Sequence, residues 1–193
     1  MAAGGVGGYF GARLAAAGHD VAFLARGAHL AAIRERGLIV ESALGDLHIK
    51  DAKATDDPAA VGPVDIVLFA VKLWDTEHAG TLGRALIGRD TRLITLQNGI
   101  DSPERLAAIL GAEHVVAGVA YIATVIGEPG IIRQTSRFAR IRCGRLDGKP
   151  DDKLEAFVAA ARAAGIDIAL SDDIQIERWR KFVFLVTMSA ATA

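Results

Sequence analysis

The chain has 193 residues with a formal net charge of −1, and 51% of its residues are hydrophobic. This length provides one or two domains with a substantial core, and the near-neutral charge argues against nucleic acid as a partner. Cys143 is the single cysteine, which excludes an internal disulfide and fits a reducing compartment, so we expect a cytoplasmic protein.

The sequence also disfavours membrane and metal-binding classes of protein. No apolar stretch reaches the length of about 18 residues that a membrane span needs, and the first residues lack the pattern of a signal peptide. The five histidines are widely spaced, so no metal site is expected.

The first predicted elements are a glycine-rich turn, a helix and a strand. The turn consists of Gly4, Gly5, Val6 and Gly7. Val6, Phe10 and Leu14 lie on one helical face, which predicts a helix ending at Gly18, and residues 20–25 then predict a strand. In a dinucleotide-binding βαβ unit, such glycines let the backbone approach a pyrophosphate, and the helix N-terminus supplies free N–H groups. We therefore expect the four turn residues to bind the cofactor.

Two features depart from the usual dinucleotide-binding fingerprint. Ala2 stands where the first glycine of Gly-x-Gly-x-x-Gly belongs, and no apolar strand precedes the turn. A plain helix entry without a ligand is therefore the alternative interpretation of these glycines.

Arg26 follows the strand at the position that distinguishes the two nicotinamide cofactors. An NAD site places an acidic residue about 20 residues after the glycines, where it binds the ribose 2′-hydroxyl. Arg26 occupies that place instead, and a guanidinium can hold a 2′-phosphate through two parallel hydrogen bonds. The sequence therefore predicts NADPH/NADP+ as the cofactor, with an arginine in a solvated turn as the alternative.

From residue 28 to residue 170, predicted helices and strands alternate. Helices are predicted over 28–36, 77–86, 103–110 and 151–164. Strands are predicted over 64–71, 91–96, 138–143 and 166–170. Antiparallel pairs are predicted for 38–42 with 46–51 around Gly45, and for 115–123 with 131–135 around the turn 127–130. Residues 1–170 are therefore predicted to form an α/β, Rossmann-type domain with a doubly wound sheet whose first strand is missing.

The last segment, residues 171–193, predicts one helix with apolar side chains on every side. Its apolar residues include Trp179, Phe182, Val183, Phe184, Leu185, Val186 and Met188. A helix that is apolar all round is buried all round. Either a partner chain covers it, as in a homodimer, or the sequence is cut short, and the absent first strand favours the second interpretation.

Four segments resemble the ketopantoate reductase (2-dehydropantoate 2-reductase) family and occur in the same order. They are residues 4–11, Phe69-Ala70-Val71-Lys72, Leu96-Gln97-Asn98-Gly99 and Glu177-Arg178-Trp179-Arg180-Lys181. The resemblance covers nearly all of this chain but only the larger, N-terminal part of a family member. It implies NADPH-dependent reduction of 2-dehydropantoate to (R)-pantoate in pantothenate synthesis. It also implies that residues 171–193 begin an all-helical C-terminal domain for substrate binding and dimerisation.

The resemblance assigns a role to three polar residues. Lys181 matches the catalytic, substrate-binding lysine, Asn98 lies in the substrate and cofactor site, and Lys72 lies near the cofactor. An ammonium beside a ketone can hydrogen-bond its oxygen and deliver a proton, and an amide can both donate and accept. The plainer interpretations are a surface Glu177–Lys181 pair, an Asn-Gly turn and a strand-end lysine in solvent.

The chain also departs from the family near the predicted substrate. Many members carry asparagines in the helix after the catalytic lysine, where this chain has Leu185 and Ser189. A serine and a glutamate from the family's later helical domain have no counterpart here. The expected substrate is a small 2-keto acid, but its identity stays open. The alternatives are an NADPH-dependent reductase of another 2-keto acid or ketone, and a non-catalytic NADP-binding fragment.

Overall fold

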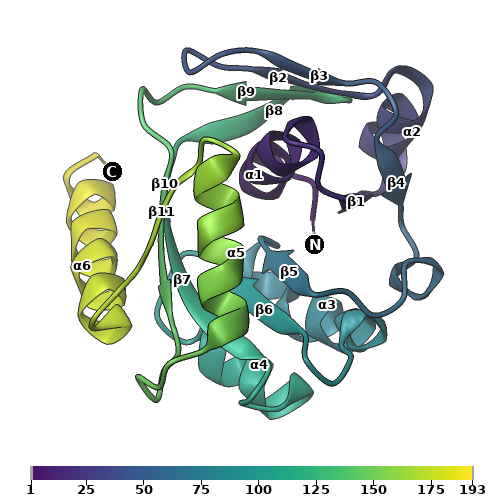
Figure 1. Ribbon diagram of the computed structural model, residues 1–193. Coiled ribbons are helices and arrows are strands. Elements are labelled where there is room, and N and C mark those ends of the chain that lie inside the picture. Colours follow the sequence, from purple (N-terminus) through teal and green to yellow (C-terminus); the bar gives the residue numbers. More distant parts are fainter. Residues whose placement is uncertain (1, 193) are drawn as a thin grey trace.

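The computed structural model describes residues 2–192 and shows an α/β fold whose strands form three sheets (Figure 1). The strands of the largest sheet are β5 (Ile66–Phe69), β6 (Arg92–Thr95), β7 (Val115–Tyr121), β10 (Arg140–Gly144) and β11 (Asp167–Leu170). Their order is β11–β10–β7–β6–β5. Strands β5, β6 and β7 are parallel, whereas β10 pairs antiparallel with β7 and parallel with β11.

The remaining strands form two smaller sheets. Their strands are β1 (Ala22–Leu24), β2 (Leu38–Glu41), β3 (Leu47–Ile49), β4 (Lys53–Thr55), β8 (Thr124–Glu128) and β9 (Ile131–Gln134). Strands β1 and β4 form a parallel pair, and the other four form a sheet in the order β3–β2–β9–β8.

Helices cover both faces of the five-stranded sheet. The α-helices are α1 (Gly5–Ala16), α2 (Gly27–Arg36), α3 (Thr76–Gly83), α4 (Ser102–Leu110), α5 (Asp152–Ala163) and α6 (Ile174–Thr192), and the 3-10 helices are η1 (Pro58–Ala60), η2 (Leu73–Asp75) and η3 (Arg84–Leu86). Figure 1 shows α5 and α6 on opposite sides of β7 and β10, and it shows α1 beneath the four-stranded sheet. The predicted α/β class is therefore confirmed.

The burial of β7 and the cap of α5 show how the sequence determines this core. The first six residues of β7 are all buried, which explains their continuous apolar run, since helices cover both faces of the strand. Asp151 caps α5 by accepting a hydrogen bond from the backbone N–H of Leu154 at 3.0 Å. The same carboxylate forms an ion pair with Arg92 at 2.6 Å, which joins α5 to the end of the sheet.

The structure differs from the predicted elements at several points. The antiparallel pair predicted between 115–123 and 131–135 is wrong, because β7 pairs with β6 and β10, whereas β9 pairs with β2 and β8. The strand predicted over 115–123 ends at Tyr121, because the chain turns into β8 at Ala123. The N–H of Ala123 donates a hydrogen bond to Ser136 Oγ at 3.0 Å, and its carbonyl accepts one from the N–H of Thr135 at 2.9 Å. The helix predicted over 77–86 continues beyond Gly83 only as η3, because glycine weakens a helix. Strand β4 was not predicted, since its three residues include lysine and threonine and carry no apolar run.

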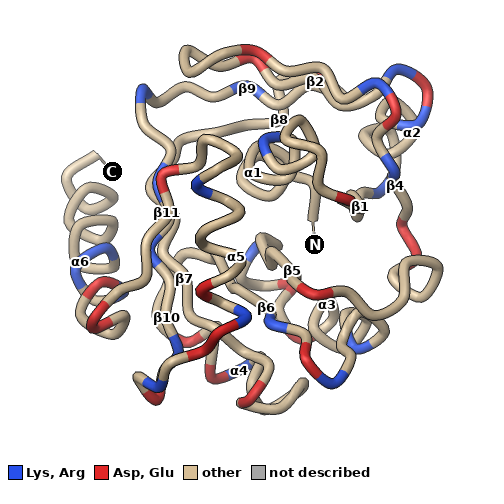
Figure 2. The backbone as a smooth tube through the Cα atoms, viewed as in Figure 1, with Lys and Arg blue, Asp and Glu red and all other residues tan. Residues whose placement is uncertain are grey.

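The expectation that the last helix is buried all round is not met among the described residues. In α6 only Ile174 and Arg178 are buried. Figure 2 shows its charged residues confined to the first half of the helix, with none in the half that leads to the C-terminus. The outer ends of the two predicted domains, Met1 and Ala193, lie outside the described residues.

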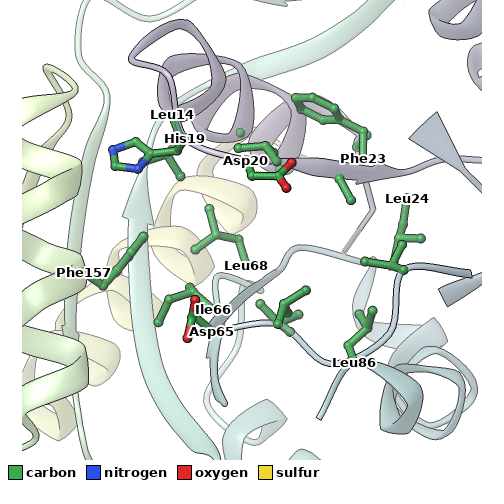
Figure 3. A pocket seen from close by; sticks show the side chains of 18 of the residues that line it. Leu14, His19, Asp20, Phe23, Leu24, Asp65, Ile66, Leu68, Leu86 and Phe157 are labelled. Atoms are coloured by element: carbon green, nitrogen blue, oxygen red, sulfur yellow. The ribbon is translucent and has the colours of Figure 1, made fainter. Parts of the chain in front are cut away.

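A cavity of about 630 Å³ separates β1 from β5. Its walls include Leu14 of α1, Phe23 of β1, Ile66 of β5 and Phe157 of α5, as the close view in Figure 3 shows. The N-terminal segment enters at one end, where the backbone N–H of Ala3 donates to the carbonyl of Leu24 at 2.7 Å. The parallel pair β1–β4 and the parallel strands of the five-stranded sheet therefore face each other across this cavity, whose walls are mostly apolar.

Within residues 2–192, no helix combines the length and the apolar character required to cross a bilayer. The same residues contain no group of three or more His, Cys, Asp or Glu side chains that could hold a metal ion.

Candidate active site

The centre of the candidate site is a contact between α6 and the loop after β6. Lys181 Nζ donates a hydrogen bond to Asn98 Oδ1 at 2.8 Å and another to the backbone carbonyl of Ala120 at 2.5 Å. A lysine ammonium has three N–H donors, so one remains for a further acceptor. The structure thus brings together the two residues that the sequence predicted as substrate ligands.

The surroundings of Lys181 change its acidity. Burial lowers the pKa of Lys181 from 10.5 to about 8, because the charged form loses hydration. Its Nζ lies 5.8 Å from the centre of the Tyr121 ring, and the Tyr121 hydroxyl donates to Glu177 Oε2 at 3.3 Å. The predicted alternative of a surface Glu177–Lys181 pair does not occur, because Glu177 bonds Tyr121 and forms an ion pair with Arg180 at 3.7 Å.

A buried polar network fixes the loop that carries Asn98. Gln97 Nε2 donates to the Thr76 hydroxyl at 2.8 Å, and the Thr95 hydroxyl lies 3.1 Å from Gln97 Oε1 and 3.2 Å from the Ser102 hydroxyl. Gln97, Thr76 and Ser102 were not identified from the sequence, although the position of Gln97 beside Asn98 was a usable signal. Satisfied buried polar groups hold a loop in one conformation.

Lys72 follows β5, the neighbouring parallel strand. Its backbone carbonyl accepts a hydrogen bond from Gln97 Nε2 at 3.5 Å, so the loops after β5 and β6 touch. The carboxyl ends of adjacent parallel strands are the usual place for ligands in open α/β sheets. The side chain of Lys72 is exposed and has no hydrogen bond or ion pair within residues 2–192.

Arg26 lies at the carboxyl end of β1, where α2 begins. Its guanidinium Nη2 is 3.5 Å from Asp75 Oδ2, and the Arg26 side chain is 71% exposed. Asp75 belongs to η2, and its backbone N–H donates to the carbonyl of Lys72 at 2.9 Å. A long, exposed ion pair, a kind of contact that contributes little to stability, therefore links Arg26 to the turn that begins at Lys72.

The glycine turn forms the first turn of α1. A Cβ on Gly7 would lie 2.2 Å from the carbonyl oxygen of Ala2, and a Cβ on Gly5 would lie 2.7 Å from Thr124 Oγ1. Both positions therefore require glycine. Ala2 has a φ of +64°, the left-handed conformation that glycine favours, at the place where the fingerprint has its first glycine.

The N-terminus of α1 has unused hydrogen-bonding capacity. Gly4 provides no side-chain cap, and the first turn contains no acidic residue, so no residue of the turn itself neutralises the positive dipole end. The buried Thr124 hydroxyl has no hydrogen-bond partner among the described residues. A phosphate fits this turn chemically.

The predicted site residues form two groups along one edge of the sheets. One group holds Lys181, Asn98 and Lys72, and the other holds Arg26 and the glycine turn. Lys181 and Asn98 are in contact, and Gln97 connects their loop to Lys72. Arg26 approaches through Asp75, and the glycine turn lies close to the end of β5, because a Cβ on Gly7 would be 3.5 Å from Ala70 Cβ. Leu185 and Ser189 follow Lys181 in α6. Leu185 is partly buried, and Ser189 is exposed, with no hydrogen bond from its hydroxyl within residues 2–192.

Comparison with known proteins identifies the family of the chain. Residues 2–148 match the family described as "Ketopantoate reductase PanE/ApbA". The 2-dehydropantoate 2-reductase of Mesorhizobium japonicum is 30% identical over 201 residues, covering 93% of this chain and 61% of that protein. The chain spans about three fifths of the length of the curated relatives that it matches.

Solved structures of family members have the same fold. The 2-dehydropantoate 2-reductase from Geobacter metallireducens is 36% identical, with a TM-score of 0.89 over 95% of this chain and 60% of that chain. The enzyme of the same name from Porphyromonas gingivalis is 35% identical, with a TM-score of 0.92 over 99% of this chain and 69% of that chain. The chain therefore belongs to the ketopantoate reductase PanE/ApbA family of oxidoreductases.

Proposed function

We propose that the protein reduces 2-dehydropantoate to (R)-pantoate with NADPH. The observation that carries this proposal is the contact between Lys181 and Asn98 at the carboxyl edge of the parallel strands. The names of the relatives support the choice of substrate, because most of them are 2-dehydropantoate 2-reductases.

The residues along the edge fit an NADPH molecule. The uncapped first turn of α1 provides N–H groups for the pyrophosphate, and the space beside Gly4 is open, since a Cβ there would meet no atom within 4 Å. Arg26 is exposed and suits a 2′-phosphate, which NADH lacks. Lys72 adds a second cation without a protein partner within residues 2–192.

The chemistry assigned to Lys181 is proton donation to the keto oxygen. When bound, NADPH supplies a hydride to the keto carbon. The carbonyl oxygen accepts the free N–H of Lys181 and takes that proton as the C–H bond forms, so that a hydroxyl results. The lowered pKa of about 8 makes the lysine a stronger acid than an exposed ammonium while leaving it protonated at neutral pH. Asn98 orients the ammonium through its amide oxygen.

A second candidate is a reductase for a different 2-keto acid. Leu185 is partly buried one turn after Lys181, at a position where many family members offer an asparagine amide. An apolar side chain there favours a substrate with fewer hydroxyl groups than 2-dehydropantoate, since an unpaired hydroxyl near it loses hydrogen bonds. A non-catalytic NADP-binding role is the third candidate.

We also propose that residues 171–193 begin a helical domain that completes the substrate site. The exposed apolar side chains of α6 support this. They are Ile176, Trp179, Val183, Phe184, Val186 and Met188. An apolar surface of this extent normally packs against other protein.

A substrate panel with both cofactors separates the candidates. The full-length protein is assayed with NADPH and NADH against 2-dehydropantoate, 2-oxoisovalerate and phenylpyruvate. The proposal predicts the highest kcat/KM for 2-dehydropantoate with NADPH. A higher value for another 2-keto acid favours the second candidate, and NADPH binding without turnover of any of the three favours the third.

A further inference from the structure

The one buried arginine side chain of α6 joins this helix to the loop that carries Asn98. Arg178 is 4% exposed. Its guanidinium donates to both carboxylate oxygens of Glu104 in α4, at distances from 2.9 to 3.1 Å, and to Gln175 Oε1 at 2.6 Å. It also donates to the backbone carbonyl of Ile100, two residues after Asn98. The guanidinium thus connects α6, α4 and the Asn98 loop.

We infer that Arg178 is a positioning residue, whose contacts with Glu104 and the Ile100 carbonyl hold α6 in the register that keeps Lys181 against Asn98. Arg178 and Lys181 are three residues apart and therefore lie on the same side of α6. One binds the loop beyond Asn98, and the other binds Asn98 itself. The functional importance of this register rests on the proposed role of Lys181.

Stability alone explains this buried ion pair poorly. Removing two charges from water costs free energy that their attraction often fails to recover, and apolar replacements of such pairs are frequently neutral or stabilising. A better-supported use of a buried charge pair is to select one packing register. Glu104 is 53% exposed, so the cost of desolvation falls mainly on Arg178.

Besides Lys181, which bonds Asn98 and the Ala120 carbonyl, the other polar anchor of α6 to the sheet within residues 2–192 is weaker than Arg178. Glu177 accepts one hydrogen bond of 3.3 Å from Tyr121 on β7, whereas Arg178 makes several shorter ones. Apolar packing adds little, because Ile174, which packs against Ala117 and Val119, is the one buried apolar residue of α6 within residues 2–192. Apart from Lys181 itself, whose position is in question, the guanidinium is the one side-chain tie between α6 and the Asn98 loop within residues 2–192.

The test combines turnover with the pKa of Lys181, measured by NMR of ¹³C-methylated lysines in the full-length protein. In Arg178→Met the kcat should fall by about 10- to 100-fold, the effect of displacing a reacting group by about 1 Å. The Kd for NADPH should stay within about threefold, because the contacts of Arg178 lie away from the cofactor turn. Arg180→Met is the matched control, since Arg180 lies on the same helix with a 72% exposed side chain.

Glu104→Gln distinguishes positioning from simple electrostatics and serves if Arg178→Met fails to fold. Lys181 lies beside Tyr121 on β7, and the charged groups that act on Tyr121 are Glu177 on α6 and Arg140 and Arg142 on β10. Arg178 and Arg180 lie on the same helix as Lys181, and this variant substitutes none of these residues. Loss of the Glu104 charge alone would lower the pKa of Lys181. Loss of register exposes the ammonium to water and raises its pKa, and we expect the rise.

The outcomes separate this inference from the proposed function. A fall in kcat together with a raised Lys181 pKa in both variants supports positioning. Unchanged kcat and pKa in folded variants, or a lowered pKa in Glu104→Gln, would overturn it while leaving the reductase proposal intact. If the wild-type protein reduces no 2-keto acid, the proposed function fails, but the Lys181 pKa still reports whether Arg178 sets the register.

Discussion

Lys181 and Asn98 are 83 residues apart in the chain, yet the ammonium of the first donates a 2.8 Å hydrogen bond to the amide oxygen of the second. The contact exists because α6 packs on β7 while Asn98 follows the adjacent strand β6. A charged group, a partner that accepts its hydrogen bond and a free N–H are thereby brought together at the edge where open α/β sheets usually bind ligands.

The first prediction concerns the pH dependence of reduction. Burial lowers the pKa of Lys181 from 10.5 to about 8, and the protonated form is the proton donor. The rate of reduction should therefore fall as pH rises through about 8, and the rate of the reverse oxidation should rise over the same range. Steady-state rates between pH 6 and pH 10, roughly two units either side of that pKa, measure both.

Lys181→Arg is the control for this profile. A guanidinium stays protonated over the whole range, so the residual activity of the variant should not change near pH 8. A wild-type profile that is flat across this range, or a limb that persists in the arginine variant, would assign the titration to another group.

The second prediction concerns the choice of cofactor. Arg26→Ala should weaken NADPH binding by about 1.5–3 kcal/mol, the contribution of a hydrogen bond to a charged group, and should leave NADH binding nearly unchanged. Titration of both cofactors by intrinsic fluorescence measures the two Kd values. Arg34→Ala is a suitable control, because Arg34 lies on the same helix and pairs with Asp56 at 3.7 Å. Equal losses for NADPH and NADH would mean that Arg26 is only structural.

The third prediction concerns the glycine turn. Gly7→Ala should lower the free energy of unfolding by about 1–3 kcal/mol, as overpacking does, because its Cβ would lie 2.2 Å from the Ala2 carbonyl oxygen. Gly4→Ala is the matched variant, since a Cβ at that position meets no atom within 4 Å. Urea denaturation compares the two, and equal stability of both variants with the wild type would contradict the close approach.

Sequence patterns predicted the elements better than their connections. The apolar runs of β5 and β6 identify buried parallel strands, because a continuous apolar run reports burial on both faces. The run of β7 was instead predicted to pair with residues 131–135, whereas it pairs with β6 and β10. The division of residues 115–128 between two sheets depends on hydrogen bonds from Ala123 to Thr135 and Ser136, which no local pattern reveals. The short strand β4 carries too few apolar residues to produce a signal.

The candidate site shows the same division between local and long-range information. Lys181, Asn98 and Lys72 could be named only through resemblance to a family, since a lysine on a helix or an asparagine before glycine has common structural explanations. The role of Arg178 could not be predicted, because its burial depends on Glu104 and Ile100 from distant segments. Arg26 was the exception, because an arginine at the end of the strand that follows a glycine-rich turn by itself suggests a 2′-phosphate ligand.

The fourth prediction concerns the exposed apolar side of α6. Val183 and Phe184 are each 59% exposed, and the chain of 193 residues should therefore self-associate through this helix. The double variant Val183→Lys/Phe184→Lys should be more monomeric in sedimentation velocity. Leu82→Lys on α3, where Leu82 is 46% exposed, should have no such effect. Association that persists equally in all three proteins would place the contact elsewhere.

The most direct measurement is the turnover of 2-dehydropantoate with NADPH by the full-length protein and by its Lys181→Ala variant. The wild type should reduce the keto acid, and the variant should lose about 10²–10⁴-fold in kcat, the usual effect of removing a general acid, while its Kd for NADPH stays the same. Near-normal turnover in a folded Lys181→Ala protein would contradict the assignment of Lys181 as the proton donor.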